Sequence, residues 1–123
     1  MGKKIILTIA ALTLFTLSSN AQKVNGIDLK DIDADYIEIS EIPRMSSNTL
    51  VAIDYGQKSS LWNFKEQVLR DDEGRELELN TMVEALNMLS KYGYELVSVY
   101  TTQSQNGGIQ LRHYVLKKQK ATK

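Results

Sequence analysis

The chain contains no cysteine, one proline and one histidine among its 123 residues. Without cysteine the protein cannot form a disulfide and cannot carry a lipid on a thiol, so its fold depends on packing alone. One histidine cannot supply the Cys and His ligands of a structural zinc site. Cysteine nucleophiles are excluded, and the serine motif G-x-S-x-G is absent. The sequence therefore predicts no catalytic set, no metal site and no cofactor.

The N-terminus has the three parts of a secretory signal peptide. Lys3 and Lys4 precede an apolar run over residues 5–17, and small residues follow at Ser19 and Ala21. The run is too short to span the hydrocarbon core, which needs about 20 apolar residues. We therefore predict cleavage after Ala21 and export of the mature chain to the periplasm or the medium.

The charges are balanced, with 15 Lys and Arg against 15 Asp and Glu. A nucleic-acid-binding protein needs a clustered basic face to neutralise phosphates. The basic cluster of this chain is its tail, which as a chain end is expected to be solvated; it comprises Lys117, Lys118, Lys120 and Lys123. We predict no nucleic-acid partner and no membrane anchor after signal cleavage.

The first half of the mature chain contains strand patterns. Residues 36–41 alternate between apolar and polar side chains, with Ile37 and Ile39 on the same face. Such alternation is typical of a half-buried strand. A second strand is predicted over residues 49–55, and a short third strand near residues 66–69.

A helix is predicted to begin at Thr81, because Glu84 three residues later completes a capping box. Its apolar side chains recur at helical spacing; they are Met82, Ala85, Leu86 and Leu89. Gly93 stands where a helix-terminating glycine is expected. Residues 94–101 are rich in β-branched and aromatic side chains on both faces, which predicts a central strand. A hairpin turn at residues 105–108 leads to a returning strand over residues 109–116.

The predicted fold is a two-layer α+β domain, a mostly antiparallel sheet of four to five strands with one main helix packed on one face. The predicted segments are a signal peptide at residues 1–21, a flexible lead-in with little structure at 22–33, a single domain at 34–118, and a disordered tail at 119–123.

Three short motifs resemble a small bacterial domain of unknown function. They are ALN at residues 85–87, GYELV at 93–97 and HYVLKK at 113–118. In that domain a helix ending in LN precedes GWELV, a strand pair and a closing strand. Tyr94 stands where the pattern has Trp, so a contact that requires Trp is not carried over.

The chain also resembles small exported proteins of Gram-negative bacteria, through DYG at residues 54–56, DEG at 72–74 and the helix onward. The resemblance covers residues 49–118. It implies a fold and supplies no activity, ligand or site residue.

Carboxylates crowd two segments. Asp31, Asp33 and Asp35 copy the first spacings of a calcium loop, but Tyr36 replaces the glycine of its turn and Ile42 replaces its closing glutamate. We therefore expect a solvated acidic segment. The second segment is predicted to be an exposed turn rather than a glycosidase pair; it contains Asp71, Asp72, Glu73, Glu76 and Glu78.

Aromatic side chains provide the candidate binding surface, which consists of Trp62, Phe64, Tyr36 and Tyr55. Trp62 lies in the least regular segment of the chain, between Ser60 and Asn63, where an aromatic side chain can anchor a partner. The alternative is that Trp62 folds over the sheet as a lid.

These observations favour a non-catalytic binding or interaction module of the cell envelope. The expected partner is an unidentified protein or envelope component, bound through the sheet face or an unpaired strand edge near Tyr36 or residues 61–69. Association of identical copies through a strand edge is a further expectation.

The sequence leaves two alternative functions open. A small hydrolase or lyase would require at least two of Asp54, Glu95, Tyr100 and His113 to converge in a pocket, although a hydrogen-bonded sheet histidine is the simpler interpretation of His113. A small-ligand carrier would require an apolar cavity between the helix and the sheet.

Overall fold

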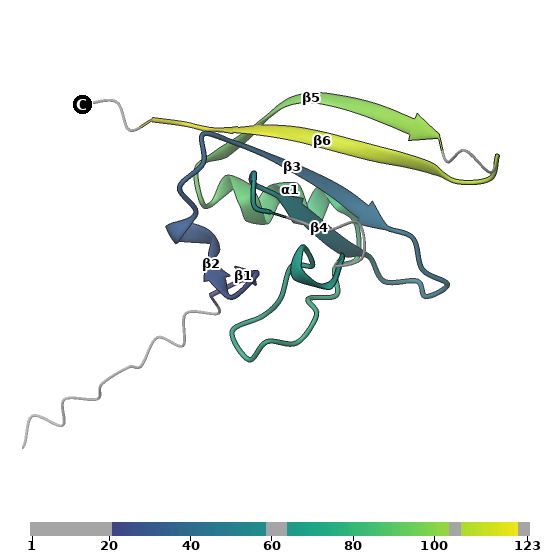
Figure 1. Cartoon of the computed structure of the whole chain (residues 1–123), viewed down its shortest axis with the longest axis horizontal. Helices are drawn as coiled ribbons and strands as arrows, with labels where there is room; N and C mark the ends of the chain where they lie inside the picture. Colours follow the sequence, from purple (N-terminus) through teal and green to yellow (C-terminus); the bar gives the residue numbers. More distant parts are fainter. Residues whose placement is uncertain (1–20, 59–63, 104–106, 121–123) are drawn as a thin grey trace, which may run out of the picture.

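An antiparallel sheet and one helix form the centre of the fold (Figure 1). The computed structural model describes residues 21–58, 64–103 and 107–120, apart from the side chain of Phe64. The four-stranded sheet has the order β4-β3-β6-β5. Its elements are β3 Tyr36–Ile42, β4 Leu50–Asp54, β5 Tyr94–Gln103, β6 Gln110–Lys118 and the helix α1 Met82–Ser90. The predicted α+β class, with one helix and a mostly antiparallel sheet, is confirmed.

Successive side chains of β3 point to the two opposite faces of the sheet. Ile37 and Ile39 are buried, as their spacing predicts, and belong to the same core cluster as α1. On the same face, Ile37 lies opposite Leu116 of β6 and Ile39 lies opposite Ile53 of β4. Glu38 lies on the other face, which we call the outer face, because successive strand residues point to opposite sides.

Helix α1 begins where the capping box predicts. Thr81 is extended, and its hydroxyl accepts a hydrogen bond from the Glu84 amide at 3.2 Å. The Glu84 carboxylate returns to the Asn80 amide at 2.7 Å, one residue before the expected position. Ala85 and Leu89 are fully buried against the sheet. The helix is nine residues long, shorter than the twelve or so that the pattern predicts.

Gly93 joins α1 to β5 with a φ of +87°. No atom lies within 4 Å of the position that a Cβ would occupy, so a side chain there meets backbone strain but no clash. We expect Gly93→Ala to lower the free energy of unfolding by about 1–2 kcal/mol, measured by urea denaturation. Gly108 has equally open surroundings and no positive φ; an equal loss from Gly108→Ala would contradict this explanation.

Residues 22–33, predicted to be an unstructured lead-in, instead form part of the core. Strands β1 (Lys23–Val24) and β2 (Ile27–Asp28) form a hairpin, followed by the 3-10 helix η1 (Leu29–Asp31). The hairpin turns at Asn25 and Gly26, whose φ angles are +50° and +74°, the geometry that an Asn-Gly pair favours. Three large apolar side chains of this segment, those of Val24, Leu29 and Ile32, are buried, while Ile27 is 38% exposed. The buried surface offsets the entropy of ordering the segment.

The segment after η2 (Phe64–Glu66) covers one edge of the sheet. The Ile53 amide donates to the Gln67 carbonyl at 2.8 Å, and the Leu69 amide donates to the Val51 carbonyl at 2.9 Å. The predicted short strand at 66–69 is therefore present only as an isolated bridge at Val68. Its pairing nevertheless satisfies backbone groups of β4 that would otherwise be open.

Strand β5 lies at the opposite edge of the sheet, and the prediction that it is a central strand is wrong. Its composition suggested two covered faces, but every residue after Tyr94 is exposed. Figure 1 shows the β5–β6 hairpin extending past the end of α1, so the helix covers only the first part of it. A β-branched composition thus reflects strand propensity here rather than burial.

The first residue of the predicted disordered tail at 119–123, Gln119, is hydrogen-bonded to the rest of the fold. The Gln119 amide donates to the Gly93 carbonyl at 2.7 Å, and its side chain donates to Glu95. Residues 121–123 and residues 1–20 of the predicted signal peptide, which spans residues 1–21, lie outside the described part of the chain.

Candidate functional site

A hydrogen-bonded cluster of four side chains lies on the outer face of the sheet. We call Glu38, Tyr100, Thr102 and His113 the outer cluster. Nδ1 of His113 lies 2.7 Å from Oε1 of Glu38, and Nε2 lies 2.8 Å from the Thr102 hydroxyl. The Tyr100 hydroxyl donates to Oε2 of Glu38 at 2.7 Å. The Tyr100 and His113 rings stack, with centroids 4.6 Å apart and planes at 10°.

Strand register brings the outer cluster together. His113 is opposite Ser40 of β3 and Tyr100 of β5, so its ring lies between the two neighbouring strands. Glu38 and Thr102 contact it from either side. Because the Glu38 carboxylate only accepts hydrogen bonds, neutral His113 carries its proton on Nδ1, and its Nε2 accepts a hydrogen bond from the Thr102 hydroxyl.

The environment of Tyr100 fixes it as a hydrogen-bond donor. The hydrogen bond to Glu38 raises the pKa of the Tyr100 phenol above its ordinary value, with smaller contributions from burial and from the negative charges of Glu38 and Asp54. A raised phenol pKa keeps the hydroxyl protonated at neutral pH. Tyr100 therefore orients Glu38 and does not act as a base.

Three of the four residues proposed for a hydrolase or lyase lie near one another. Tyr100 and His113 stack, and Asp54 is the cross-strand partner of Glu38. Glu95 lies at the other end of β5, opposite Lys117. The sequence did not identify Glu38 or Thr102 as members, because their contacts depend on strand order.

Neither of two surface hollows formed by described residues contains the outer cluster. One, of about 520 Å³, lies near the Tyr94 end of β5. Its lining includes Tyr36 of β3, Glu95 and Val97 of β5, and Lys117 of β6. The other, of about 410 Å³, is lined by residues around Pro43 and Arg112. No residue of α1 lines either one.

Of the four predicted binding aromatics, the structure describes the side chains of Tyr36 and Tyr55, and these two have different environments. Tyr36 is 53% exposed, and the Lys117 ammonium lies 5.6 Å from the centre of its ring. Tyr55 packs against the core instead. Phe64 begins η2, and Trp62 lies outside the described residues. Strand β3 pairs with β6 from Tyr36 to Ser40 and with β4 from Glu38 to Ile42, so the predicted unpaired edge near Tyr36 is limited to Tyr36 and Ile37 on the β4 side.

The open edge of the sheet is β5, which we call the free edge. Among the described residues no further strand pairs with β5. Its exposed apolar side chains are Leu96 (43%), Val97 (58%), Val99 (47%) and Tyr100 (43%). From Leu96 to Gln103 the strand carries no charge and no proline. Charged side chains and proline are the features by which proteins ordinarily protect an exposed edge, and this part of β5 has neither.

The ladder determines which backbone groups face the free edge. The Lys118 amide donates to the Asp35 carbonyl next to β3, so alternation directs the backbone groups of His113 and Leu111 toward β5. Their partners are Tyr100 and Thr102, whose backbone groups therefore face β6. It follows that Val99, Thr101 and Gln103 direct their amides and carbonyls outward.

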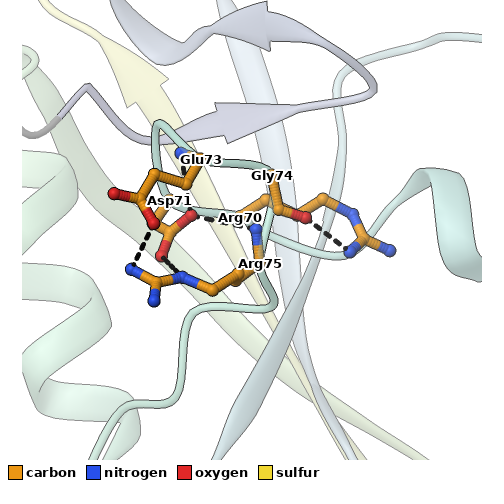
Figure 2. Close-up of polar contacts among 5 residues, drawn as sticks. All are labelled: Arg70, Asp71, Glu73, Gly74 and Arg75. Carbon is orange, nitrogen blue, oxygen red and sulfur yellow. Dashed lines mark hydrogen bonds and ion pairs between the residues drawn. The ribbon is translucent and has the colours of Figure 1, made fainter.

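The second acidic segment is a structural turn (Figure 2). The Asp71 carboxylate accepts from the amides of Glu73 and Arg75 at 3.0 and 2.9 Å. Nε of Arg75 also donates to it at 2.9 Å, while another guanidinium nitrogen of Arg75 lies 2.9 Å from Glu73. Arg70 donates to the Gly74 carbonyl at 3.1 Å. The predicted exposed turn is confirmed.

Hydrogen bonds give Asp71 a defined pH dependence. The Arg75 amide, followed by the Arg75 side chain and the Glu73 amide, lowers the pKa of Asp71 despite the opposing effect of burial. A lowered folded pKa means that its stabilising contribution is complete at neutral pH and is lost as pH falls through that pKa. We expect Asp71→Asn to reduce the acid sensitivity of the melting temperature. The same reduction in Asp72→Asn would contradict this role.

Within the described residues, no group of three or more His, Cys, Asp and Glu side chains is placed to hold a metal ion. No helix in that part of the chain is long and apolar enough to cross a membrane. Comparisons with protein-family models, curated proteins and solved structures found no match.

Proposed function

We propose that this protein is a non-catalytic binding module of the cell envelope that adds a partner strand to the free edge of β5. The observation that carries the proposal is the uncharged ladder edge at Val99, Thr101 and Gln103. Strand addition derives affinity from main-chain hydrogen bonds and specificity from alternate side chains. The export signal predicted at residues 1–21 supports an envelope location and is part of the same proposal.

Because the Thr101 amide faces outward, one substitution can remove its hydrogen bond to an added strand and leave the bonds of the sheet intact. Proline at position 101 removes that amide but no bond within the sheet, and edge strands tolerate proline there. We expect Thr101→Pro to keep the circular dichroism spectrum of the wild type and to lose strand-mediated association, measured by analytical ultracentrifugation and by photo-cross-linking from position 103 in cells.

The matched control is Thr101→Ala, which shortens the side chain and keeps the amide. This variant is expected to associate like the wild type. Equal association of the alanine and proline variants, with both folded, would show that the backbone of the free edge is not used.

A second candidate function is acyl transfer, because Glu38, His113 and Thr102 form a continuous chain of hydrogen bonds. Such a chain orients a base against a hydroxyl nucleophile. In this reaction His113 Nε2 takes the Thr102 hydroxyl proton as Oγ1 bonds to the acyl carbon. The departing alkoxide then takes that proton from His113, and water releases the acyl group as a carboxylic acid.

An activated aryl ester tests this candidate. Catalysis at the outer cluster predicts ester hydrolysis above that of free imidazole, an acyl adduct on Thr102 in the mass spectrum, and loss of both in His113→Gln and Thr102→Val. Hydrolysis at the free-imidazole rate, unchanged by Thr102→Val, would remove the acyl-transfer function.

A further inference from the structure

We propose that the strand added to β5 is β5 of a second copy of this chain, antiparallel and related by a two-fold axis at Thr101. This inference rests on strand addition at the free edge and names its occupant. The two four-stranded sheets then join into one continuous sheet through their β5 edges.

The backbone determines the register of the two copies. Only residues whose amides and carbonyls face outward can exchange hydrogen bonds across the edge, and from Ser98 onward these are Val99, Thr101 and Gln103. Centring the pair on Thr101 places Thr101 opposite itself and Val99 opposite Gln103 of the second copy. All three residues are then bonded on both strands. A pair centred on Tyr100 would instead place Gln103 opposite Val97, where β5 bulges, and Gln103 would then remain unpaired.

A β-bulge ends the pairing on the other side. The β5–β6 register shifts between Leu96 and Ser98, leaving Val97 as an extra residue. A bulge bends its strand and increases the local twist. The straight part of β5 therefore runs from Ser98 to Gln103, and the register centred on Thr101 uses this part.

The distribution of charge favours a second copy over an unrelated strand. On a two-fold axis a residue meets itself or a close neighbour, so a charge near the axis would face its own sign. Such pairs destabilise a ladder. The only charged residue of β5 is Glu95, far from Thr101, and residues 96–103 carry none. An unrelated partner would not require this absence of charge.

Side chains on both faces fit this register. On the outer face Tyr100 lies opposite Thr102 of the second copy. On the helix side Val99, 47% exposed, lies against the stem of Gln103, and the two Thr101 side chains meet. Aromatic, β-branched and threonine pairs of these kinds stabilise antiparallel ladders. Each copy thus covers apolar surface of the other copy that the other copy's helix leaves exposed.

Placing charges on the axis tests the inference. We expect wild-type protein to sediment at twice the monomer mass and Thr101→Lys, bearing like charges on the axis, to sediment as a monomer. An equal mixture of Thr101→Lys and Thr101→Glu is expected to restore a dimer containing one copy of each. Val83→Lys, on the exposed side of α1, is the control and is expected to remain dimeric.

Arg112 lies opposite Thr101 on β6 of the same copy, so an unchanged circular dichroism spectrum must first show that each variant is folded. A folded Thr101→Lys that remains dimeric, or a mixture that remains monomeric, would overturn the inference.

The absence of cysteine permits a second, geometric test. Directly opposite residues of a bonded antiparallel pair lie about 5.5 Å apart at Cα, a separation that a disulfide spans. We expect Thr101→Cys to form a covalent dimer on mild oxidation, and Val83→Cys to remain largely monomeric. Equal cross-linking of both variants would contradict the proposed axis.

Failure of this inference can be distinguished from failure of the proposed function. A wild-type monomer that cross-links from position 103 to a different protein, with loss of the cross-link in Thr101→Pro, would retain strand addition and remove the second copy. A dimer that persists in folded Thr101→Pro and Thr101→Lys, together with an unchanged cross-linking pattern from position 103 in Thr101→Pro, would remove both, because no association would then depend on the β5 edge.

Discussion

Replacing Leu89 by alanine is expected to lower the free energy of unfolding by about 2–5 kcal/mol, the range for large-to-small changes in a protein core. Leu89 is fully buried and belongs to the core cluster, which it joins from the last turn of α1. Its removal leaves a cavity between the helix and the sheet, because closely packed surroundings relax only partly into the lost volume. Urea denaturation with unchanged m value measures the loss.

Leu86 is the matched control for Leu89. It has the same side chain and lies one turn earlier on α1, but it is only partly buried. Leu86→Ala is therefore expected to cost less, since part of its surface stays in water. The sequence alone predicts comparable burial for both residues. A larger loss from Leu86→Ala than from Leu89→Ala would contradict the orientation of the helix.

Leu29→Ala is expected to have an effect of similar size, about 2–5 kcal/mol. Leu29 lies in η1, is fully inaccessible to solvent, and belongs to the same cluster as Ile39 and Leu89. The segment 22–33 is also bonded to the rest of the fold, because the Lys23 and Arg70 backbones exchange hydrogen bonds of 2.8 and 2.7 Å.

Lys30→Ala is the control for Leu29, because Lys30 is the exposed neighbour in η1. A surface change of this kind is expected to stay within about 0.5 kcal/mol. If Leu29→Ala were as mild as Lys30→Ala, residues 22–33 would be the loosely attached lead-in that their polar composition suggests.

Local patterns predicted the parts of the fold that depend on neighbouring residues. The alternation around Ile37 and Ile39 requires only the period of a strand. The capping pair Thr81 and Glu84 requires only one turn of helix, and Gly93 requires only a positive φ. Each of these signals is complete within a few residues, so tertiary context could not reverse it.

The segment 22–33 was mispredicted although a local signal was present. Asn25 and Gly26 form the turn of a short hairpin, the strongest short-range hairpin signal. The flanking strands are only two residues each, too short to show alternation. The backbone of Lys23 pairs with that of Arg70, which is remote in sequence, and composition does not reveal that pairing.

The candidate site could not be predicted for the same reason. The Glu38–His113 contact joins residues 75 positions apart and requires β6 to lie between β3 and β5. Strand order likewise decides that β5 is an edge and that Tyr36 is in a central strand. Sequence periodicity gives the faces of a strand but not its neighbours.

Amide hydrogen exchange along β5, measured by NMR at low and high protein concentration, tests the central claim most directly. At low concentration Tyr100 and Thr102 should exchange slowly, while Val99, Thr101 and Gln103 exchange rapidly. At high concentration the second copy should slow exchange at these three residues as well. Exchange at Val99 and Thr101 that does not depend on concentration would contradict the pairing of two β5 edges.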